Sequence, residues 1–491
     1  MTSAPFPSLC ITEDRFVPQG AFAEAQAAYL SPDRAIIAEL DALLAEKKTG
    51  VVAHFYMDPE LQGVLSACTW PHIHISDSLT MADAAVKMAE EGCEQVVVLG
   101  VDFMSENARA MLDAAGKQST PVYRVAAEPI GCSLAESAEA LAYGAYLSRA
   151  ARTPRSLHVV YINTSLRTKA KSHALVPTIT CTSSNVVSTV LTAFAQIEDA
   201  HVFFGPDTYM GRNLKELFTS LAEGGLAELD DEAVRALHPA HDRASIAALL
   251  PRFHYFEQGT CIVHHMFGAE VAERVRRDYA DAFVTAHFEV PGEMFTVALE
   301  QQRVGRGVVG STSNILAFIT RQVKATIEAG SRERLRFVLG TEAGMITSIV
   351  NDVRKVLRAH PGSGVEVEIV FPVASEAIAP SEDSELQIVP GVSGGEGCST
   401  AGGCATCPYM KMNSLDALLA LVRKLGVSDD DLVAYEPHKY TELVLGRTAA
   451  DLGGEPILHM RAFSRGGKLS DALVTDVVTR HERRAAAQAT E

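Results

Sequence analysis

Short apolar runs alternate with amphipathic stretches along most of this 491-residue chain. Residues 51–56 are a β-branched run, residues 77–86 are a Ser/Thr cluster followed by an Ala- and Val-rich stretch, and residues 95–108 are a second apolar run with a glycine turn. Short β-branched runs are typical of buried parallel strands, and a Ser or Thr before an apolar helical pattern is typical of a helix N-cap. The pattern therefore predicts alternating strands and helices, which form an α/β fold with a parallel sheet.

This order of elements occurs three times between residues 51 and 410, and each round ends in a cysteine. His54 in the first round lies 24 positions before Ser78, and His287 in the third round lies 24 positions before Ser311. A repeat of this kind indicates one supersecondary unit that is used several times. We therefore predict the α/β fold class, with three repeated αβα, parallel-sheet domains around a pseudo-threefold axis.

The repeats also set the expected domain boundaries. We predict an N-terminal tail and helix over 1–50, repeat domains over 51–150, 151–270 and 271–412, and a C-terminal helical segment and tail over 413–491. Two insertions interrupt the pattern. Residues 215–252 are polar with a helical pattern, and residues 372–403 have the composition of a loop.

Three cysteines, Cys132, Cys261 and Cys407, stand at the same place in the three rounds, so a pseudo-threefold axis would bring them to one point. Soft thiolates suit an iron–sulfur cluster or zinc. Three protein ligands would leave one metal position open for use as a Lewis acid. The alternative is three separate core cysteines, and the recurrence of the position argues against it.

Cys404 and Cys407 form a CxxC, which suits a zinc half-site or a redox pair. Because the sequence has no second CxxC, a four-cysteine zinc site is not expected. We take Cys407 as the metal ligand, and Cys398 or Cys404 as either a bystander or its partner in a regulatory disulfide. Cys181, at a predicted strand end, is a rival fourth ligand.

Polar side chains stand at the ends of the predicted strands, where ligands bind in open α/β sheets. The acid–base candidates are Tyr56, Tyr161, His54, His264, His287 and Glu289. A lone strand-end histidine is more often a core residue than a catalyst, but His54 and His287 occupy matching repeat positions. Helix starts at Ser78, Ser183 and Thr312 offer backbone N–H groups to a phosphate or carboxylate, in addition to capping.

Composition narrows the class of partner. A net charge of −18 disfavours a nucleic-acid backbone or an anionic membrane. No apolar run is long enough to span a bilayer, and the first residues lack the features of a secretory signal. Nine cysteines at irregular spacing favour metal or redox use over a disulfide scaffold. The lack of a membrane-spanning run and of a secretory signal predicts a cytoplasmic protein.

The strand ends, helix starts and cysteine segments together carry a set of recognisable motifs. They read HFYxxPELQ (54–62), DSL (77–79), GVDFMSENA (100–108), YINTSLRTKA (161–170), CTSSN (181–185), GTCIVH (259–264), HFE (287–289), GSTS (310–313), GTEAGM (340–345) and CPYMKMN (407–413). They cover most of residues 50–415. In this order the sequence resembles the quinolinate synthase family, the A protein of bacterial NAD biosynthesis.

The resemblance implies a triangular molecule of three α/β domains with a [4Fe-4S] cluster on Cys132, Cys261 and Cys407. It implies condensation of iminoaspartate with dihydroxyacetone phosphate to give quinolinate, phosphate and water, with the open iron as Lewis acid. Iminoaspartate would come from an aspartate oxidase or dehydrogenase.

The same resemblance implies roles for individual residues. The substrate pocket would be lined by His54, Ser78, Tyr161, Ile162, Asn163, Ser183, His287, Phe288, Glu289 and Thr312. Tyr56 and Glu289 would transfer protons, with His54 and His264 as the other catalytic residues and Tyr161 near the bound intermediate.

Some positions depart from the family pattern. The usual His-Pro-Glu-Cys is here 287–290, His-Phe-Glu-Val, and the usual Gly before Asp-Ser is Ser76. The stretch 63–76 is longer than expected. One rival is another three-cysteine cluster enzyme of the same plan, of the diphthamide-synthesis or isoprenoid-reductase type, and the motifs at 54–62 and 407–413 argue against it.

A second rival is a cluster-bearing redox sensor, which would not need the acid–base groups at the strand ends. Use of NAD as a substrate is not expected, because no G-x-G-x-x-G follows a predicted strand.

Overall fold

The computed structural model describes residues 5–223, 231–261, 263–264, 267–372, 407, 409–427 and 430–488. The chain divides into two compact units. The first unit comprises Met1–Gly100, Thr120–Ile130 and Ile262–Glu436. The second unit comprises Val101–Ser119, Gly131–Cys261 and Pro437–Glu491.

One sheet of the first unit has four parallel strands in the order β4-β3-β5-β6. The strands are β3 (Thr49–His54), β4 (Ile73–Ser76), β5 (Gln95–Leu99) and β6 (Val122–Arg124), and the nearby helices are α2 (Arg34–Glu46), α3 (Pro59–Ala67) and α4 (Ser78–Glu90). All six residues of β3 are buried. A continuous buried run is typical of a central parallel strand, so the first repeat forms the sheet that its pattern predicts.

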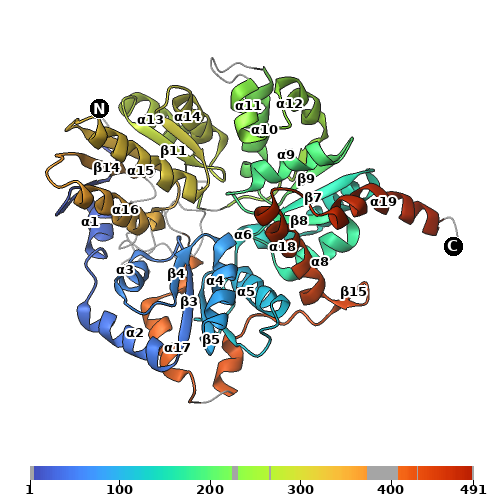
Figure 1. Cartoon of the computed structure of the whole chain (residues 1–491), viewed down its shortest axis with the longest axis horizontal. Helices are drawn as coiled ribbons and strands as arrows, with labels where there is room; N and C mark the ends of the chain where they lie inside the picture. Colours follow the sequence, from blue (N-terminus) through green and yellow to red (C-terminus); the bar gives the residue numbers. More distant parts are fainter. Residues whose placement is uncertain are drawn as a thin grey trace, which may run out of the picture. The chain divides into compact units, whose positions relative to one another are not determined.

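The other sheet of the first unit has six strands in the order β12-β11-β13-β14-β1-β2. Its strands are β1 (Ser8–Ile11), β2 (Phe16–Gln19), β11 (Phe283–His287), β12 (Gly307–Gly310), β13 (Arg334–Gly340) and β14 (Glu366–Val370). Helices α14 and α15 pack against β11 and β12 (Figure 1). The helices of this region are α1 (Ala21–Ala28), α13 (Ala269–Asp278), α14 (Gly292–Arg303), α15 (Thr312–Glu328), η3 (Ala343–Met345) and α16 (Ile346–Ala359).

The N-terminal residues differ from the predicted tail. β1 pairs antiparallel with β14, and β2 continues the sheet beyond it. Each strand has only four residues, which is too few for a clear periodic pattern in the sequence. Pairing covers the edge of β14, which would otherwise present unpaired backbone groups.

The second unit has one sheet of four parallel strands in the order β10-β9-β7-β8. Its strands are β7 (Ser156–Tyr161), β8 (Thr178–Cys181), β9 (His201–Gly205) and β10 (Phe253–Tyr255). Its helices before the C-terminal segment are α5 (Asp102–Ala114), α6 (Ser133–Glu139), α7 (Leu141–Arg152), α8 (Leu166–Leu175), α9 (Val186–Gln196), α10 (Thr208–Glu223), α11 (Asp231–Leu237), α12 (Arg243–Leu249) and η1 (Leu250–Arg252). The insertion predicted over 215–252 is therefore helical in its described part.

The predicted C-terminal segment over 413–491 is divided between the two units. Its first part contains α17 (Leu415–Lys424) and η6 (Asp430–Tyr435) and lies in the first unit, as does the preceding η5 (Met410–Met412). Its second part, from Pro437, lies in the second unit and contains β15 (Leu443–Val444), β16 (Arg447–Thr448), α18 (Ala449–Gly466) and α19 (Asp471–Gln488). α18 packs against α8 (Figure 1). A Cβ atom on Gly453 would lie 2.2 Å from the carbonyl oxygen of Leu166, so only glycine allows this approach.

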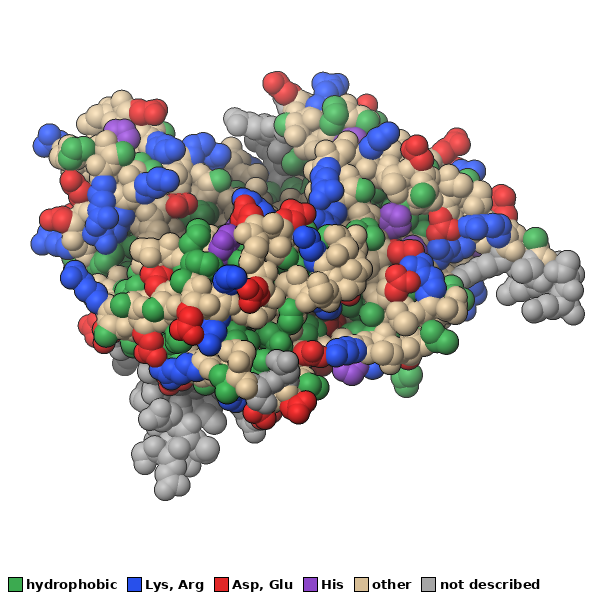
Figure 2. All heavy atoms as spheres, turned by 60° about the horizontal axis from the view of Figure 1, so that its bottom comes forward, with side chains coloured by type: hydrophobic (Ala, Val, Ile, Leu, Met, Phe, Trp, Pro, Cys, Tyr) green, Lys and Arg blue, Asp and Glu red, His purple; other side chains and the backbone are tan. Residues whose placement is uncertain are grey.

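The predicted fold class is confirmed: strands alternate with helices, and each of the three repeats contributes a set of parallel strands, the third extended by the antiparallel strands β1 and β2. The pseudo-threefold arrangement and the division into five segments stay predictions. Within the described residues, no helix is long and apolar enough to cross a bilayer. Figure 2 shows acidic and basic side chains intermixed over the face that it draws, so the net charge of −18 is not gathered into one block there.

Candidate active site

Two histidines of the first unit have the same local geometry. His54 is the last residue of β3 and His287 is the last residue of β11, and both side chains are buried. The Nδ1 atom of His54 accepts the backbone N–H of Tyr56 at 3.2 Å, and that of His287 accepts the backbone N–H of Glu289 at 3.3 Å. An Nδ1 acceptor implies a proton on Nε2 of a neutral ring. The matching repeat positions therefore have matching hydrogen bonds.

Four aromatic rings of the first unit form one cluster. His264 stacks on His287 with ring centroids 5.2 Å apart, and His54 meets Tyr56 edge-on at 4.7 Å. The ring of Tyr56 lies 6.1 Å from that of His264 and 6.5 Å from that of His287. His54 and Tyr56 come from the first predicted repeat, His264 from the second and His287 from the third. The cluster therefore brings together residues from all three repeats.

A carboxylate joins this ring cluster. Glu289 Oε2 lies 3.2 Å from His264 Nδ1, and Glu289 Oε1 lies 3.8 Å from His287 Nδ1. Both His264 and Glu289 are almost fully buried. The shorter distance is that of a hydrogen bond and places a proton on Nδ1 of His264, whereas the longer one is an electrostatic contact only.

Burial keeps the strand-end histidines neutral. Loss of solvation lowers the pKa of His287 to about 3 and that of His54 to about 4, although the charge of Glu289 opposes both shifts. Removing an imidazolium from water costs more than these carboxylates return. Near pH 7 both rings therefore offer hydrogen bonds without carrying a positive charge.

Thr341 and Glu342, which follow β13, extend the cluster. Both belong to the GTEAGM motif, but no role was predicted for either of them from the sequence. The Tyr56 hydroxyl lies 3.2 Å from Thr341 Oγ1. Glu342 is buried, and burial raises the pKa of its carboxyl well above the ordinary value, with a further rise from the charge of Glu289. The backbone N–H of Cys407 opposes this rise by donating to the Glu342 carboxyl. Only their position after a strand end signals these residues in the sequence.

The predicted helix starts are of different kinds. Ser311 caps α15 through a capping box with Asn314, and Thr312 is the buried first residue of that helix. At α4 the backbone N–H of Thr80 donates to Asp77, so Asp77 and not Ser78 supplies the side-chain cap. In the second unit, the buried Ser183 precedes the N-cap residue of α9, Asn185.

The predicted residues Tyr161, Ile162 and Asn163 lie at the end of β7 and in the turn before α8. Lys169, a fully buried residue, donates its ammonium group to the carbonyl oxygens of Ile162, at 3.1 Å, and of Thr164. These bonds fix the orientation of the turn that carries Asn163. The sequence pattern missed this role, because it depends on contacts that only the folded helix makes.

Lys169 shares its environment with a buried carboxyl. Glu106 accepts the backbone N–H of Leu166 at 3.0 Å and the hydroxyl of Tyr440 at 2.9 Å. Burial lowers the pKa of Lys169 and raises that of Glu106, while the attraction between the two opposes both shifts. All these groups have partners, which is the arrangement expected of a structural network.

Two of the three predicted metal ligands lie on neighbouring segments of the second unit. Cys132 and Cys261 are each half-buried, and the hydroxyl of Ser133 donates to the carbonyl of Thr260 at 3.1 Å. The backbone N–H of Thr208 donates to the Gly259 carbonyl at 2.6 Å, and the backbone N–H of Gly259 donates to Thr208 Oγ1 at 2.9 Å. These two bonds fix the segment before Cys261. Half-buried thiols on adjacent fixed segments are a donor set that fits an iron–sulfur cluster.

The third predicted ligand, Cys407, is half-buried in the first unit. The convergence of the three cysteines stays a prediction, and Cys398 and Cys404 lie outside the described residues, as does any disulfide from Cys404 to Cys407. Cys181 is fully buried, and burial raises the pKa of its thiol well above the ordinary value. This burial disfavours Cys181 as a thiolate ligand.

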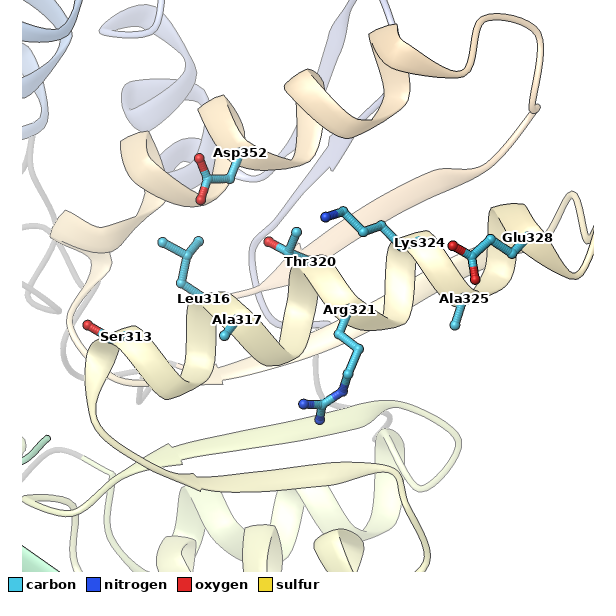
Figure 3. A pocket seen from close by; sticks show the side chains of 9 residues that line it. All are labelled: Ser313, Leu316, Ala317, Thr320, Arg321, Lys324, Ala325, Glu328 and Asp352. Carbon is cyan, nitrogen blue, oxygen red and sulfur yellow. The ribbon is translucent and has the colours of Figure 1, made fainter.

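The first unit also has a groove between α15 and α16 (Figure 3). Its volume is 610 Å³. Its lining residues are Ser313, Leu316, Ala317, Thr320, Arg321, Lys324, Ala325, Glu328 and Asp352. Predicted catalytic and metal-binding residues are not among them.

Comparison with known proteins gives a consistent result. A family model described as "Quinolinate synthetase A protein" matches residues 38–435. Proteins named "Quinolinate synthase, chloroplastic" are similar over almost the whole chain. One from Nicotiana tabacum is 56% identical over 96% of this chain and 66% of its own length. One from Oryza sativa subsp. japonica is 53% identical over 96% of this chain and 69% of its own length. One from Arabidopsis thaliana is 52% identical over 98% of this chain and 68% of its own length.

These names correct the predicted cytoplasmic location, because the relatives are chloroplastic proteins. The prediction used the lack of a membrane-spanning run and of a secretory signal. Neither feature separates the cytosol from a plastid. The chain spans about two thirds of the length of these relatives.

The matched region contains the strand-end histidines, the GTEAGM segment and all three predicted cysteine ligands. The resemblance seen in the motifs is therefore confirmed. This chain belongs to the quinolinate synthase family.

Proposed function

We propose that this chain is a quinolinate synthase, which condenses iminoaspartate with dihydroxyacetone phosphate in the synthesis of NAD. The observation that carries the proposal is the buried cluster of Tyr56, His264, His287 and Glu289, together with His54, at the ends of β3 and β11. These are the residues that the family motifs assign to substrate binding and proton transfer. The rival cluster enzymes of the same plan are not favoured by this set of motifs.

The reaction needs several proton transfers. Iminoaspartate and dihydroxyacetone phosphate form one carbon–carbon bond and one carbon–nitrogen bond, and they release phosphate and two water molecules. Each departing hydroxyl group must gain a proton, and carbon-bound hydrogens must leave as protons. Positioned acids and bases typically contribute about 10²- to 10⁴-fold each to such steps. A buried set of tyrosine, histidine and glutamate side chains suits this requirement.

We propose that His54 and His287 bind the anionic groups of the substrate. Because each Nδ1 accepts a backbone N–H, each ring presents an Nε2–H donor while remaining neutral. Such donors orient a carboxylate without titrating near neutral pH. Thr312 and Ser78, at the starts of α15 and α4, add backbone N–H groups that suit a phosphate or a second carboxylate.

Glu289 and Tyr56 are the proposed proton-transfer groups. Glu289 lies within hydrogen-bond distance of His264, which can pass a proton to or from the carboxylate. The Tyr56 hydroxyl lies 3.2 Å from Thr341 Oγ1, and this hydrogen bond holds the phenol oxygen in place. The proposed substrate contacts in the second unit are Tyr161, Ile162, Asn163 and Ser183. A further proposed substrate contact, in the first unit, is Phe288, which lies between His287 and Glu289 in the chain.

We further propose that Cys132, Cys261 and Cys407 hold a [4Fe-4S] cluster. The support is their recurrence in the three repeats and their half-buried thiols. When bound, the cluster would supply a Lewis acid at an iron without a protein ligand. Cys181 is not proposed as a ligand, because its thiol is fully buried in the sheet.

A plastid location and an upstream oxidation of aspartate complete the proposal. The names of the relatives support the compartment. Iminoaspartate is an imine and hydrolyses readily, so an aspartate oxidase or dehydrogenase must supply it close to its site of use. Fractionation of cells that make the natural protein tests the location, and recovery in the cytosolic fraction would contradict it.

The decisive assay uses anaerobically purified protein, with iron and sulfide measured before quinolinate formation. We expect about four irons and four sulfides per chain, as for one [4Fe-4S] cluster, and quinolinate without any external electron donor. Alanine at Cys132, Cys261 or Cys407 should remove the cluster, whereas Cys181→Ala should retain it. Tyr56→Phe should retain the cluster and lose turnover. A wild type that holds iron but makes no quinolinate would overturn the assignment, and a requirement for an electron donor would favour a reductase.

A further inference from the structure

Gln62, the last residue of the HFYxxPELQ motif, lies on α3 and is completely buried. Its Nε2 atom lies within hydrogen-bond distance of three backbone carbonyl oxygens: those of Phe55 and Met57, each at 2.8 Å, and that of Gly344 at 2.7 Å. The amide has two N–H groups, so two of the three carbonyls share one of them. Phe55 and Met57 are the two neighbours of Tyr56 in the chain. One side-chain amide therefore holds the backbone on both sides of that tyrosine.

The third acceptor connects this turn to a distant segment. Gly344 follows Thr341 by three residues in the segment after β13, and the Tyr56 hydroxyl lies 3.2 Å from Thr341 Oγ1. A Cβ atom on Gly344 would lie 2.9 Å from both the Phe55 carbonyl oxygen and the Tyr56 Cα atom. The two segments are thus in direct contact, and Gln62 bridges their backbones beside the tyrosine.

The chemistry of the contact requires a glutamine amide. Three carbonyl oxygens face the same atom, so that atom must be a donor, and a carboxylate at this place would repel them. The other amide atom, Gln62 Oε1, is buried without a hydrogen-bond partner among the described residues. A buried acceptor without a partner is unfavourable. The stabilising contribution of this side chain therefore comes from its Nε2 donor group.

We propose that Gln62 is the positioning residue for Tyr56: its amide ties the carbonyls on either side of the tyrosine to the segment of Thr341 and so fixes the phenol for proton transfer. The effect on catalysis rests on the proposed function, whereas the hydrogen bonds of Gln62 do not depend on it. Displacing a catalytic group by about 1 Å can cost about 100-fold in rate. The hydrogen bonds of this amide go to the Phe55, Met57 and Gly344 carbonyls and not to the side chain of either strand-end histidine, so we expect the larger effect in kcat and the smaller one in KM.

The test compares Gln62→Met with Gln26→Met. Methionine keeps the length of the side chain and removes the donor. Gln26, on α1, is the matched control, because it is also a fully buried glutamine but its side-chain atoms have no hydrogen-bond partner in the described structure. We expect Gln62→Met to lower kcat about 10- to 100-fold with KM changed less than about twofold, the range expected for a displaced catalytic group. Gln26→Met should keep the wild-type kcat.

A double variant separates positioning from general loss of structure. If Gln62 acts through the phenol, adding Gln62→Met to Tyr56→Phe should cause no further loss of the residual kcat. Multiplicative losses would overturn the proposal, as would a wild-type kcat in Gln62→Met. If Gln62→Met does not fold, Gly344→Ala strains the same contact and should give the same loss in kcat alone; an unchanged kcat there would contradict the proposal.

Hydrogen exchange gives a readout that does not depend on the reaction. The backbone N–H of Tyr56 bonds to His54 Nδ1 and that of Met57 to the His54 carbonyl, so both amides report on the turn. Gln62→Met should speed exchange in 54–57 and 341–345, and Gln26→Met should not. If exchange in Gln62→Met is the same as in the wild type, the positioning role is wrong, whether or not the wild type makes quinolinate. If exchange is faster in Gln62→Met but the wild type makes no quinolinate, only the proposed function is wrong.

Discussion

His287 in the first unit and His158 in the second are equally buried, and burial lowers the pKa of each to about 3. Their surroundings differ. His158 lies in the middle of β7, where Nε2 meets the Tyr143 hydroxyl at 2.8 Å and Nδ1 meets Thr178 Oγ1 at 3.4 Å. Both ring nitrogens are thus used within the core.

His287 instead ends its strand. Its Nδ1 accepts a backbone N–H, and its ring stacks on His264 beside Glu289. Ligands bind at the carboxyl ends of parallel strands. A strongly lowered pKa therefore does not separate a catalytic-site histidine from a core histidine in this protein. Position along the strand and the nature of the neighbours do.

The largest effect that we expect is a loss of catalytic rate on substitution of Glu289, the carboxylate beside His264 and His287. Glu289→Gln keeps the shape of the side chain and removes the base beside His264. We expect kcat to fall about 10²- to 10⁴-fold, the usual contribution of a general acid or base, with an unchanged midpoint of urea unfolding. Steady-state quinolinate formation and urea titration check the two parts. A variant that loses stability but keeps kcat would give Glu289 a structural role only.

His158→Leu should have the opposite effect. The substitution leaves the buried Tyr143 hydroxyl without its partner, and a buried polar group without a partner costs about 1–3 kcal/mol. We expect the free energy of unfolding to fall by about that amount, with kcat per folded molecule unchanged. Urea unfolding and kinetics on the same sample measure both. A loss of kcat at full stability would refute the distinction between the two histidines.

The pH dependence of stability should also report on His158. Its pKa is about 3 in the folded protein against about 6.5 in the unfolded chain, so the unfolded state binds more protons as the pH falls below about 6.5. The stability is therefore fully present above that pH and is lost below it, by about 2 kcal/mol for one such histidine between pH 7 and pH 5. His158→Leu should lose about that much less than the wild type. Parallel stability curves over this range would contradict the lowered pKa.

The smallest effect is expected in the buried network of the second unit. Tyr440→Phe removes the hydroxyl that donates to Glu106, while the backbone N–H of Leu166 continues to donate to it. We expect a loss of about 1 kcal/mol in unfolding free energy, typical of one hydrogen bond, and little change in kcat. A large rise in KM instead would assign the C-terminal segment a direct influence on the turn around Asn163.

The repeat pattern was sufficient to predict the three parallel sheets, because short buried runs and capped helices recur at constant spacing. It also predicted the strand-end pair of His54 and His287, since equal positions in a repeat acquire equal backbone surroundings. The wrong location came from features that do not distinguish compartments.

The residues that were missed depend on contacts between distant segments. Gln62 acquires its role only when the segment of Gly344 reaches it, and Lys169 only when α8 turns back onto Ile162. Neither contact leaves a periodic signal in the sequence. The sequence also missed the strands β1 and β2. β1 pairs with β14, which is far away in the chain, and each of the two strands has too few residues for a periodic pattern.

Quinolinate formation under anaerobic conditions, compared among the wild type, His287→Gln and His158→Leu at equal amounts of folded protein, tests the central claim most directly. We predict that the wild type and His158→Leu form quinolinate from iminoaspartate and dihydroxyacetone phosphate at the same rate, and that His287→Gln does so at least about 100-fold more slowly, as for loss of a group that contacts the reacting substrate. Equal rates in His287→Gln and the wild type, or no quinolinate from any of them, would contradict the account.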